Sequence, residues 1–445
     1  MTSAPSSSPQ SIVDRGTRPV RVALLGHGTV GSALHRLLVE HREHVRLATG
    51  RDIDVCAVLV RDAGRDREGL DPATILVTDS IEDVLAAEPD VVCEAMGGLD
   101  PTREHLLAFL DRGIPVVTAN KQLVARHGTE LFARAEAGGA QLRFEASVCG
   151  AVPIVRMLRE SLAATRIERL LGILNGTTNY MLSAMAATGA DYDDALADAQ
   201  RLGYAEPDPS EDVGGVDAAA KLAILAGIAF GTTVRVEDVR ATGITGVTAE
   251  DVAHARILGC RLRLIARAER LRTSSDGPLL ALDVTPMLVP ETHPLAMIAG
   301  ATNAVLVDGA PFGRLVVQGP GAGGPETASA LAGDVVSVLG SEPSFLTRDP
   351  HVTAPVIAPR DARSERHYVR MRVPDQPGVL AAVAGALAGS GVSIERVLQQ
   401  RAGNGEATLV LTTHPCAPGA IEAALATVTS VDRTVLPMLD EDTAS

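Results

Sequence analysis

The stretch VRVALLGHGTVGSALHRLLVEH, residues 20–41, decides the fold of the first part of the chain. Its apolar start, Val20–Leu25, predicts a buried strand, and Ser32–His41 predicts a helix. The glycines between them follow the order of strand, glycine turn and helix that a dinucleotide fingerprint requires. They allow a tight turn, a close approach to a pyrophosphate, and close packing of helix on strand. We therefore expect an α/β Rossmann-type domain that binds its cofactor through Gly26, Gly28, Thr29, Val30 and Gly31.

The next predicted strand, Asp54–Val60, bears on the choice of cofactor. A carboxylate at that strand end would bind the ribose 2′-hydroxyl of NAD, whereas an arginine would accommodate the 2′-phosphate of NADP. Both types are present, as Arg61 and Asp62. We expect NADP, bound through Arg61, with NAD as the alternative. His27, inside the glycine turn, is interpreted as a tolerated loop residue.

Further strands are predicted at Val91–Glu94, Pro115–Thr118 and Leu142–Ala146. Ligands of an open α/β sheet lie at the carboxyl ends of its strands. Lys121 follows such an end, so it is expected where nicotinamide and substrate meet. The alternative is an ordinary surface lysine at a helix start.

A second stretch, AQRLGYAEPDPSEDVGGVDAAAKL (199–222), carries an acidic loop followed by a predicted helix, Val216–Phe230. Asp217 and Lys221 are four residues apart and so share one helix face. Lys221 is the only lysine after Lys121. A lysine can exchange a proton once burial lowers its pKa, and an arginine cannot. The stretch therefore indicates a site that holds a small cation and moves a proton, with a solvated ion pair as the alternative.

The pattern G-Y-x-E-P-D-P-x-x-D-x-x-G-x-D-x-x-x-K, residues 203–221, resembles the signature of homoserine dehydrogenases, and T-A-N-K at 118–121 is also similar. The resemblance covers nearly the whole chain after residue 19. It implies interconversion of L-homoserine and L-aspartate 4-semialdehyde with a nicotinamide cofactor, in threonine and methionine biosynthesis.

The resemblance also implies roles for single residues. Lys221 would move the proton, Lys121 would assist, and Asp217 would orient Lys221 and the substrate. Glu206 would take the substrate ammonium group. The pocket would be completed by Gly203, Asp212 and Thr177, the last from the motif N-G-T-T-N-Y (175–180), where Thr177 or Thr178 is expected to cap a helix.

Two further motifs carry expectations from the same family. The turn E-A-S-V-x-G-x-x-P (145–153) implies a monovalent cation, sodium first, with the ligands Glu145, Val148, Gly150 and Val152. The glycine loop 319–324 resembles the place where the chain returns to the first domain, so Gly321 is expected at the cofactor. The alternative for that loop is a flexible linker.

The last part of the chain predicts the order βαββαβ, which is a ferredoxin-like unit. With D-Q-P-G-V-L at 375–380 it resembles an ACT regulatory domain, which implies an amino-acid effector, L-threonine first. The candidate regulatory residues are Asp375, Gly378 and Gly391. The predicted domains are a disordered tail (1–19), a Rossmann domain (20–150, with a return segment 320–340), an α+β substrate domain (151–340), a linker (341–362) and the ACT domain (363–445).

Composition excludes several partners. A net charge of −15 and only 2% aromatic residues argue against nucleic acid and anionic membranes. Five scattered cysteines without C-x-x-C predict free thiols and a cytoplasmic protein. We expect a homodimer or homotetramer built on the substrate-domain sheet. Two rival functions stay open: a thiol-dependent semialdehyde dehydrogenase using Cys149, and a non-catalytic amino-acid sensor.

Overall fold

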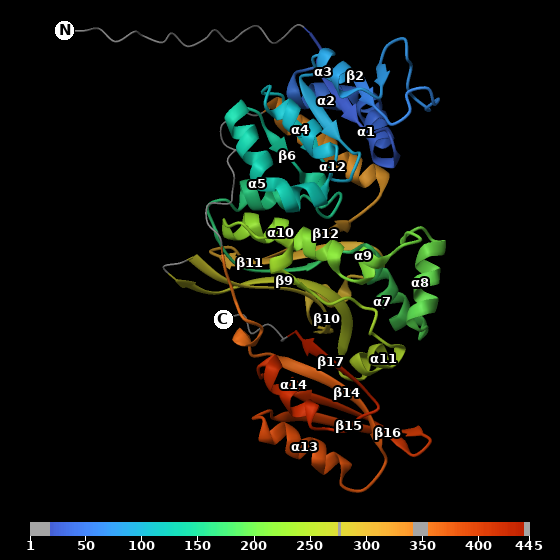
Figure 1. Cartoon of the computed structure of the whole chain (residues 1–445), viewed down its shortest axis with the longest axis vertical. Helices are drawn as coiled ribbons and strands as arrows, with labels where there is room; N and C mark the ends of the chain where they lie inside the picture. The colour runs from blue at the N-terminus through green and yellow to red at the C-terminus, as the bar shows by residue number, and fades with distance from the viewer. Residues whose placement is uncertain (1–17, 275–276, 341–354, 440–445) are drawn as a thin grey trace, which may run out of the picture.

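The computed structural model describes residues 18–274, 277–340 and 355–439. The described part of the chain forms three bodies in a row, with the blue N-terminal domain at one end and the red C-terminal domain at the other (Figure 1). Most of the predicted tail and linker, residues 1–17 and 341–354, lies outside the described residues.

The first domain is a six-stranded parallel sheet of order β3-β2-β1-β4-β5-β6, as expected for a Rossmann-type domain. Its strands are β1 (Val20–Leu25), β2 (Ile53–Leu59), β3 (Leu76–Thr78), β4 (Val91–Glu94), β5 (Val116–Thr118) and β6 (Leu142–Arg143). Its helices are α1 (Thr29–Glu40), α2 (Arg42–Thr49), α3 (Ile81–Ala86), α4 (Thr102–Leu110) and α5 (Lys121–Gly138). The prediction of a strand over Leu142–Ala146 was wrong at its end, because the chain turns into a 3-10 helix, η1 (Glu145–Ser147).

Helix α12 (Gly324–Gly340) completes this domain from far along the chain. Its residues Leu331 and Val335 share one apolar core with Leu34 and Leu38 of α1. The helix lies beside the N-terminal elements in Figure 1, orange among blue. The return segment therefore belongs structurally to the first domain.

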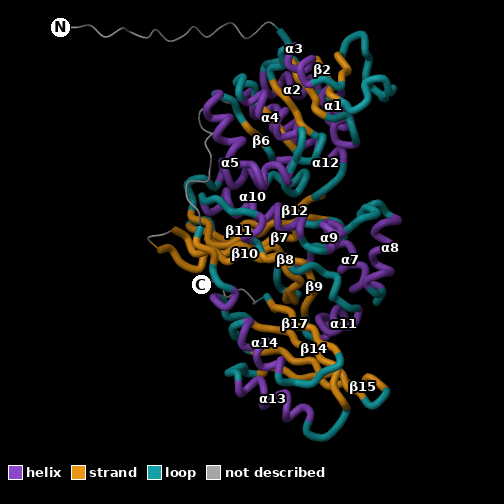
Figure 2. Tube along the Cα trace, in the orientation of Figure 1, coloured by secondary structure: helices purple, strands orange, loops and turns teal. Residues whose placement is uncertain are grey.

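The middle domain is a mainly antiparallel sheet with helices beside it (Figure 2). Its strands are β7 (Arg166–Ile173), β8 (Arg240–Ala241), β9 (Cys260–Ser274), β10 (Gly277–Pro290), β11 (Thr302–Ala310) and β12 (Gly313–Pro320). Its longer helices are α7 (Gly176–Thr188), α8 (Tyr192–Arg201), α10 (Val216–Phe230) and α11 (Ala249–Ile257). Shorter turns are α6 (Ile154–Arg156), the π-turn η2 (Met157–Ser161), α9 (Ser210–Val213), η3 (Val236–Asp238) and η4 (Pro294–Met297).

Helix α10 is the link between the first two domains. Ala, Leu and Ile fill most of it, so it is buried almost all round, and it packs against α5 on one side and the strands β7, β9 and β10 on another. Its N-terminal turn therefore lies where α5 begins, at the carboxyl end of β5. This packing brings Asp217 of α10 to Lys121 of α5.

The C-terminal domain has the predicted βαββαβ order: β14 (Arg366–Pro374), α13 (Val379–Gly389), β15 (Ile394–Gly403), β16 (Glu406–Thr413), α14 (Pro418–Ala426) and β17 (Asp432–Met438). Its sheet order is β17-β14-β16-β15. Strand β17 also pairs with β10 through Leu288 and Met438, so the two domains share one continuous sheet. A short strand, β13 (Val356–Ile357), and a 3-10 turn, η5 (Arg360–Ala362), precede this domain. No helix among the described residues is long and apolar enough to cross a membrane.

Candidate active site

Two lysines meet one buried aspartate at the boundary between the first two domains. Lys121 Nζ lies 2.5 Å from Asp217 Oδ1, and Lys221 Nζ lies 2.8 Å from Asp217 Oδ2. The Asp217 side chain is only 3% exposed, whereas the side chains of Lys221 and Lys121 are 12% and 32% exposed. Sequence reasoning paired Asp217 with Lys221 but did not predict the ion pair with Lys121, since that pair depends on how α5 packs on α10.

The charges of this group hold one another in the ionised form. Burial alone would raise the pKa of Asp217, but Lys221 and Lys121 outweigh it and hold that pKa well below its ordinary value. Burial alone would lower the pKa of Lys221, but Asp217 outweighs it and the pKa of Lys221 lies above its ordinary value. Lys221 is therefore an ammonium group at neutral pH.

The ammonium group of Lys221 has a second acceptor. It donates a hydrogen bond to the Leu174 carbonyl at 2.8 Å, and Asn303 Nδ2 donates to the same oxygen at 3.0 Å. Sequence analysis did not find Asn303 or the Leu174 carbonyl, because no motif marks a backbone oxygen or an isolated asparagine on β11.

Asn175 ties the acidic loop to the buried aspartate. Its Nδ2 donates to Asp212 Oδ1 at 2.7 Å and to Asp217 Oδ2 at 2.9 Å, while its Oδ1 accepts from the Thr178 amide. Asn175 is thus the N-cap of α7, and the prediction that Thr177 or Thr178 caps this helix was wrong. The Thr177 hydroxyl instead donates to the Tyr204 carbonyl at 2.5 Å and lies 3.2 Å from Asp212 Oδ2.

The rest of the acidic loop is open to solvent. Gly203 and Glu206 are both exposed, and Gly203 has a left-handed backbone with φ +77°. Gln200 Nε2 donates to the Glu206 carbonyl at 3.1 Å. Asn175 links Asp212 to Asp217 and Thr177 contacts Asp212, whereas Glu206 and Gly203 lie on the exposed part of the loop.

The turn 145–153 contains a buried carboxylate. Glu145 accepts hydrogen bonds from the amides of Val155 (2.8 Å) and Arg156 (2.7 Å), and its own amide donates to Asp334. Burial and then the negative charge of Asp334 raise the pKa of Glu145 to about 7. The Val152 carbonyl accepts from the Ile154 amide at 2.8 Å. Arg156 also forms a salt bridge with Asp334 at 3.1 Å, so the two carboxylates at this turn share backbone donors and one guanidinium group.

Close backbone contacts hold the same turn against the glycine loop. A Cβ added to Gly150 would lie 2.8 Å from the Gly321 carbonyl, so only a glycine fits. Gly321 lies against Gly150 and Asn303, and Gly324 of the same loop lies against Thr29. The loop therefore joins the turn 145–153 to the glycine turn of the first domain.

Cys149 is buried at this turn with φ +59°. Burial raises the pKa of its thiol to about 11, with the positive charge of Lys221 opposing the rise. A thiol in this state is a poor nucleophile, because the thiolate is the reactive form.

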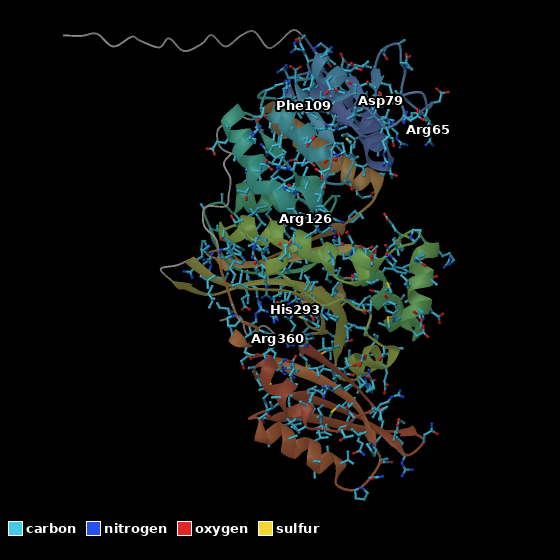
Figure 3. The ribbon with its side chains drawn as sticks, viewed as in Figure 1. Arg65, Asp79, Phe109, Arg126, His293 and Arg360 are labelled. Atoms are coloured by element: carbon cyan, nitrogen blue, oxygen red, sulfur yellow. The ribbon has the colours of Figure 1, made fainter. Side chains whose placement is uncertain are left out.

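The glycine turn opens on a cleft of about 1550 Å³. A Cβ on Gly26 would meet the Ala95 carbonyl at 2.8 Å, and one on Gly31 would meet the Gly26 carbonyl at 2.1 Å. Gly28 has open space instead, and α1 begins at Thr29, so free amides face the cleft. Arg61 and Asp62 both line it, and Figure 3 labels two further lining residues, Arg65 and Asp79.

A smaller cleft of about 370 Å³ lies in the C-terminal domain. It is lined by the turn after β14, including Asp375 and Gly378, and by Gln399 of β15. Gly378 has φ +92° and precedes α13, and Gly391 has φ +75° just after that helix. Two of the three predicted regulatory positions therefore share one cleft.

Family models match three parts of the chain. Residues 26–145 match "Homoserine dehydrogenase, NAD binding domain", residues 153–336 match "Homoserine dehydrogenase", and residues 367–433 match "ACT domain".

Whole proteins with the same name are similar over most of the chain. The homoserine dehydrogenase of Mycobacterium tuberculosis (strain H37Rv) is 46% identical over 86% of this chain and 87% of its own, and that of Corynebacterium glutamicum is 41% identical over 93% and 92%. The crystal structure of a homoserine dehydrogenase from Thiobacillus denitrificans superposes with a TM-score of 0.86 at 39% identity, covering 95% of this chain and 99% of that one. A hyperthermophilic archaeal homoserine dehydrogenase in complex with NADPH superposes with a TM-score of 0.60 at 27% identity over 72% of this chain and 98% of that one.

Proposed function

The chain belongs to the homoserine dehydrogenase family, and from this premise we propose that Lys221, Asp217 and Lys121 handle the proton when L-homoserine and L-aspartate 4-semialdehyde are interconverted. An enzyme of this family is an oxidoreductase that acts on a CH–OH group, so neither the thiol-dependent nor the sensor alternative describes its main activity. The observation that carries the residue assignment is the pair of lysines on one buried aspartate.

A bound nicotinamide would supply or accept the hydride. The protein's part is to control charge and proton at the substrate oxygen. The Lys221 ammonium group has three hydrogens, of which Asp217 and the Leu174 carbonyl take two. The third is free to bond the substrate oxygen and to stabilise negative charge there as the carbonyl is reduced.

The raised pKa of Lys221 favours the role of a fixed cation or proton donor over that of a base. In the oxidation direction a proton must leave. Lys121 shares Asp217 with Lys221 and is the more exposed of the two, so it offers a route from the buried group to solvent.

The polar groups around this centre suit an amino-acid substrate. Asp212 is held by Asn175 and Thr177 beside Asp217, and Glu206 lies on the exposed rim of the same loop. We assign the substrate ammonium group to Glu206, with Gly203, Asp212 and Thr177 completing the pocket. This assignment requires the rim loop to fold over the bound substrate.

For the cofactor, we propose NADP in preference to NAD. Arg61 follows β2 and lines the cleft at the glycine turn, as Arg65 and Arg67 do. Their positive charges suit a 2′-phosphate. Asp62 lines the same cleft and is the residue that would serve NAD. The relative kcat/KM values for the two cofactors test this choice directly.

A monovalent cation, sodium first, is proposed at Glu145 and the carbonyls of Val148, Gly150 and Val152. Glu145 is a buried carboxylate whose pKa is raised by burial and by Asp334, so a cation beside it would favour its ionised form. Since this turn lies against Gly321, a bound cation would stiffen the joint between the two domains and help to fix Lys121 against Asp217.

We propose that the ACT domain binds an amino-acid effector, L-threonine first, in the cleft lined by Asp375 and Gly378. A threonine titration of full-length protein and of Asp375→Ala tests it. Unchanged activity over the titration in wild type would contradict it.

We also propose a homodimer or homotetramer, because β12 is an edge strand of the shared sheet and its residues are mostly half-exposed or exposed.

The main test is the rate of NADP reduction with L-homoserine, in wild type and Lys221→Ala. We expect turnover in wild type and a loss of about 10²–10⁴-fold in the variant, the range for a group that handles a proton. Turnover that survives would move the proton step to Lys121 or water. No turnover in wild type would contradict the assigned reaction.

A further inference from the structure

Two histidines stand side by side in the cofactor cleft. His27 Nε2 lies 3.4 Å from His35 Nδ1, and the two rings meet edge to face with centroids 5.6 Å apart. His27 comes from the glycine turn and His35 from α1, and both line the cleft, although His35 is buried. At this distance the pair can share one proton between its facing nitrogens, and protonation of the pair would add a positive charge to the cleft.

Arginines line the same cleft as this pair, and one of them lies close to it. Arg67 is close enough that its charge contributes to lowering the pKa of His27, after burial and His35. Arg67 belongs to the segment that follows β2, so the pair lies near the side of the cleft where the ribose of a bound dinucleotide would be expected. The same cleft is lined by Arg36, Arg61, Arg65 and Arg67.

Negative charges also face the cleft, and they set how strongly the pair can hold a proton. They come from α1, from the segment after β2 and from the turns after β3 and β4: Glu40, Asp62, Asp66, Glu68, Asp79 and Asp100. In spite of them, burial lowers the pKa of both His27 and His35, so the pair is neutral near pH 7 when the cleft holds no phosphate. A phosphate dianion placed against it would reverse this balance.

We propose that the His27–His35 pair is a proton-dependent part of the binding site for the 2′-phosphate of NADP, so that binding of NADP, but not of NAD, takes up a proton onto the pair. This inference rests on the nicotinamide cofactor of the proposed function and assigns the residues that distinguish its two forms. The sequence alone led to the interpretation of His27 as a tolerated loop residue, whereas this proposal gives His27 a role in cofactor binding.

The linkage has a definite sign. A phosphate monoester is close to a dianion above about pH 6, since its second pKa is near that value. Bound beside the pair, the dianion raises the pKa of the histidines. At a pH between the pKa of the free pair and the pKa of the pair with NADP bound, binding therefore adds a proton to the pair. The affinity for NADP should therefore fall about three- to tenfold from pH 6.5 to pH 8, since one linked proton changes affinity by at most about tenfold per pH unit.

The test is isothermal titration calorimetry of the full chain with NADP and with NAD at pH 6.5–8, in two buffers of different ionisation enthalpy. The difference between buffers counts the protons taken up. We expect uptake with NADP and none with NAD, and we expect His27→Gln to remove the uptake. The matched control is His105→Gln, a histidine of the same cleft outside the pair, which should leave the uptake in place.

Three results would overturn the inference while leaving the proposed function intact: NADP binding without proton uptake, equal uptake with NAD, or uptake that persists in both His27→Gln and His35→Gln. Equal uptake with NAD would place the pair at the pyrophosphate that both cofactors share. Failure of wild type to bind either nucleotide would overturn the proposed function and this inference together.

Discussion

Arg370 of the ACT domain donates a hydrogen bond from Nε to Asp251 Oδ1 on helix α11, at 2.7 Å, and both side chains are almost wholly buried between the two domains. Tyr368 donates to the same carboxylate oxygen at 3.0 Å. Helix α11 packs against α7, whose N-cap is Asn175 of the candidate active site. The buried pair is therefore part of a continuous set of contacts between the ACT domain and the candidate active site.

Substitution of one partner of the Arg370–Asp251 pair should lower the free energy of unfolding. Asp251→Asn removes the buried counter-charge of Arg370 and leaves as its closest ion-pair partner Asp432, which lies 2.8 Å away and is half-exposed. We therefore expect a loss of about 3 kcal/mol in the free energy of unfolding, the lower end for a broken buried pair. Urea unfolding measures it. Glu250→Gln is the control, because Glu250 reaches Arg370 only at 3.9 Å and is partly exposed, so the change should be below about 1 kcal/mol. Equal losses in the two variants would contradict the assigned importance of the buried pair.

The raised pKa of Lys221 predicts that its positive charge matters more than its ability to lose a proton. Lys221→Arg keeps the charge and should retain at least about tenfold more kcat than Lys221→Met, a difference of about 1.4 kcal/mol in barrier. The measurement is the reduction of aspartate semialdehyde at pH 7. If both variants fall equally, proton exchange at this residue is indispensable and the fixed-cation role is wrong.

Glu145 predicts a pH-dependent effect of sodium. Its pKa of about 7 lies above the value of an unfolded glutamate, so the folded state binds the proton more tightly. The stability that this contributes is fully present below about pH 4.3 and is lost as pH rises through 7, by roughly 1–3 kcal/mol.

Sodium chloride should therefore raise the melting temperature more at pH 8 than at pH 6, because only the ionised carboxylate attracts the cation. Tetramethylammonium chloride at equal ionic strength controls for screening, and Glu145→Gln should remove the difference. The same response to both salts would exclude a specific cation at this turn.

Cys149 should be dispensable. It occupies a left-handed backbone, which costs a residue with a side chain about 1–2 kcal/mol and a glycine nothing. Cys149→Gly should keep its activity and lose less than about 2 kcal/mol of stability, since the relief of backbone strain offsets part of what the loss of a buried side chain costs. Cys149→Val, branched at Cβ, should be clearly destabilised. Loss of turnover in a folded Cys149→Gly would revive the thiol mechanism.

Substitutions of two glycines in the turn after β1 should have different effects, one on stability and the other on cofactor affinity. Gly31→Ala places a Cβ 2.1 Å from the Gly26 carbonyl, so we expect a loss of stability of about 2 kcal/mol or more. Gly28→Ala meets nothing in the protein and should fold normally, but its methyl group stands where a pyrophosphate would approach. Thermal melts and cofactor titrations separate the two effects. Normal cofactor affinity in Gly28→Ala would contradict the assigned position of the pyrophosphate.

Local pattern predicted most of the fold. The helix Val216–Phe230 and the strands Val20–Leu25 and Val91–Glu94 have their predicted bounds, because their apolar periods and flanking glycines are encoded within each segment. The pairing of β17 with β10 could not be predicted, since it joins residues 150 positions apart through a single backbone register.

In the candidate site, too, contacts within one helix could be predicted from the sequence, and contacts between elements could not. Asp217 and Lys221 are neighbours on one helix, so their contact followed from spacing, whereas the contact of Lys121 with Asp217 needed the packing of two helices. The Asn175 cap was missed because asparagine and threonine are both good caps and the motif offered all three positions. Glu206 lies on an exposed loop, and its role depends on a substrate that closes that loop.

The late return of α12 has a consequence for synthesis. The six strands of the first domain have left the ribosome once Arg143 has emerged, but the helix that covers α1 starts only at Gly324, about 180 residues later. At a translation rate of 5–20 residues per second this is a delay of roughly 10–35 s. During that time Leu34 and Leu38 lack their final cover, so the nascent chain offers a chaperone an apolar surface that the finished enzyme does not have.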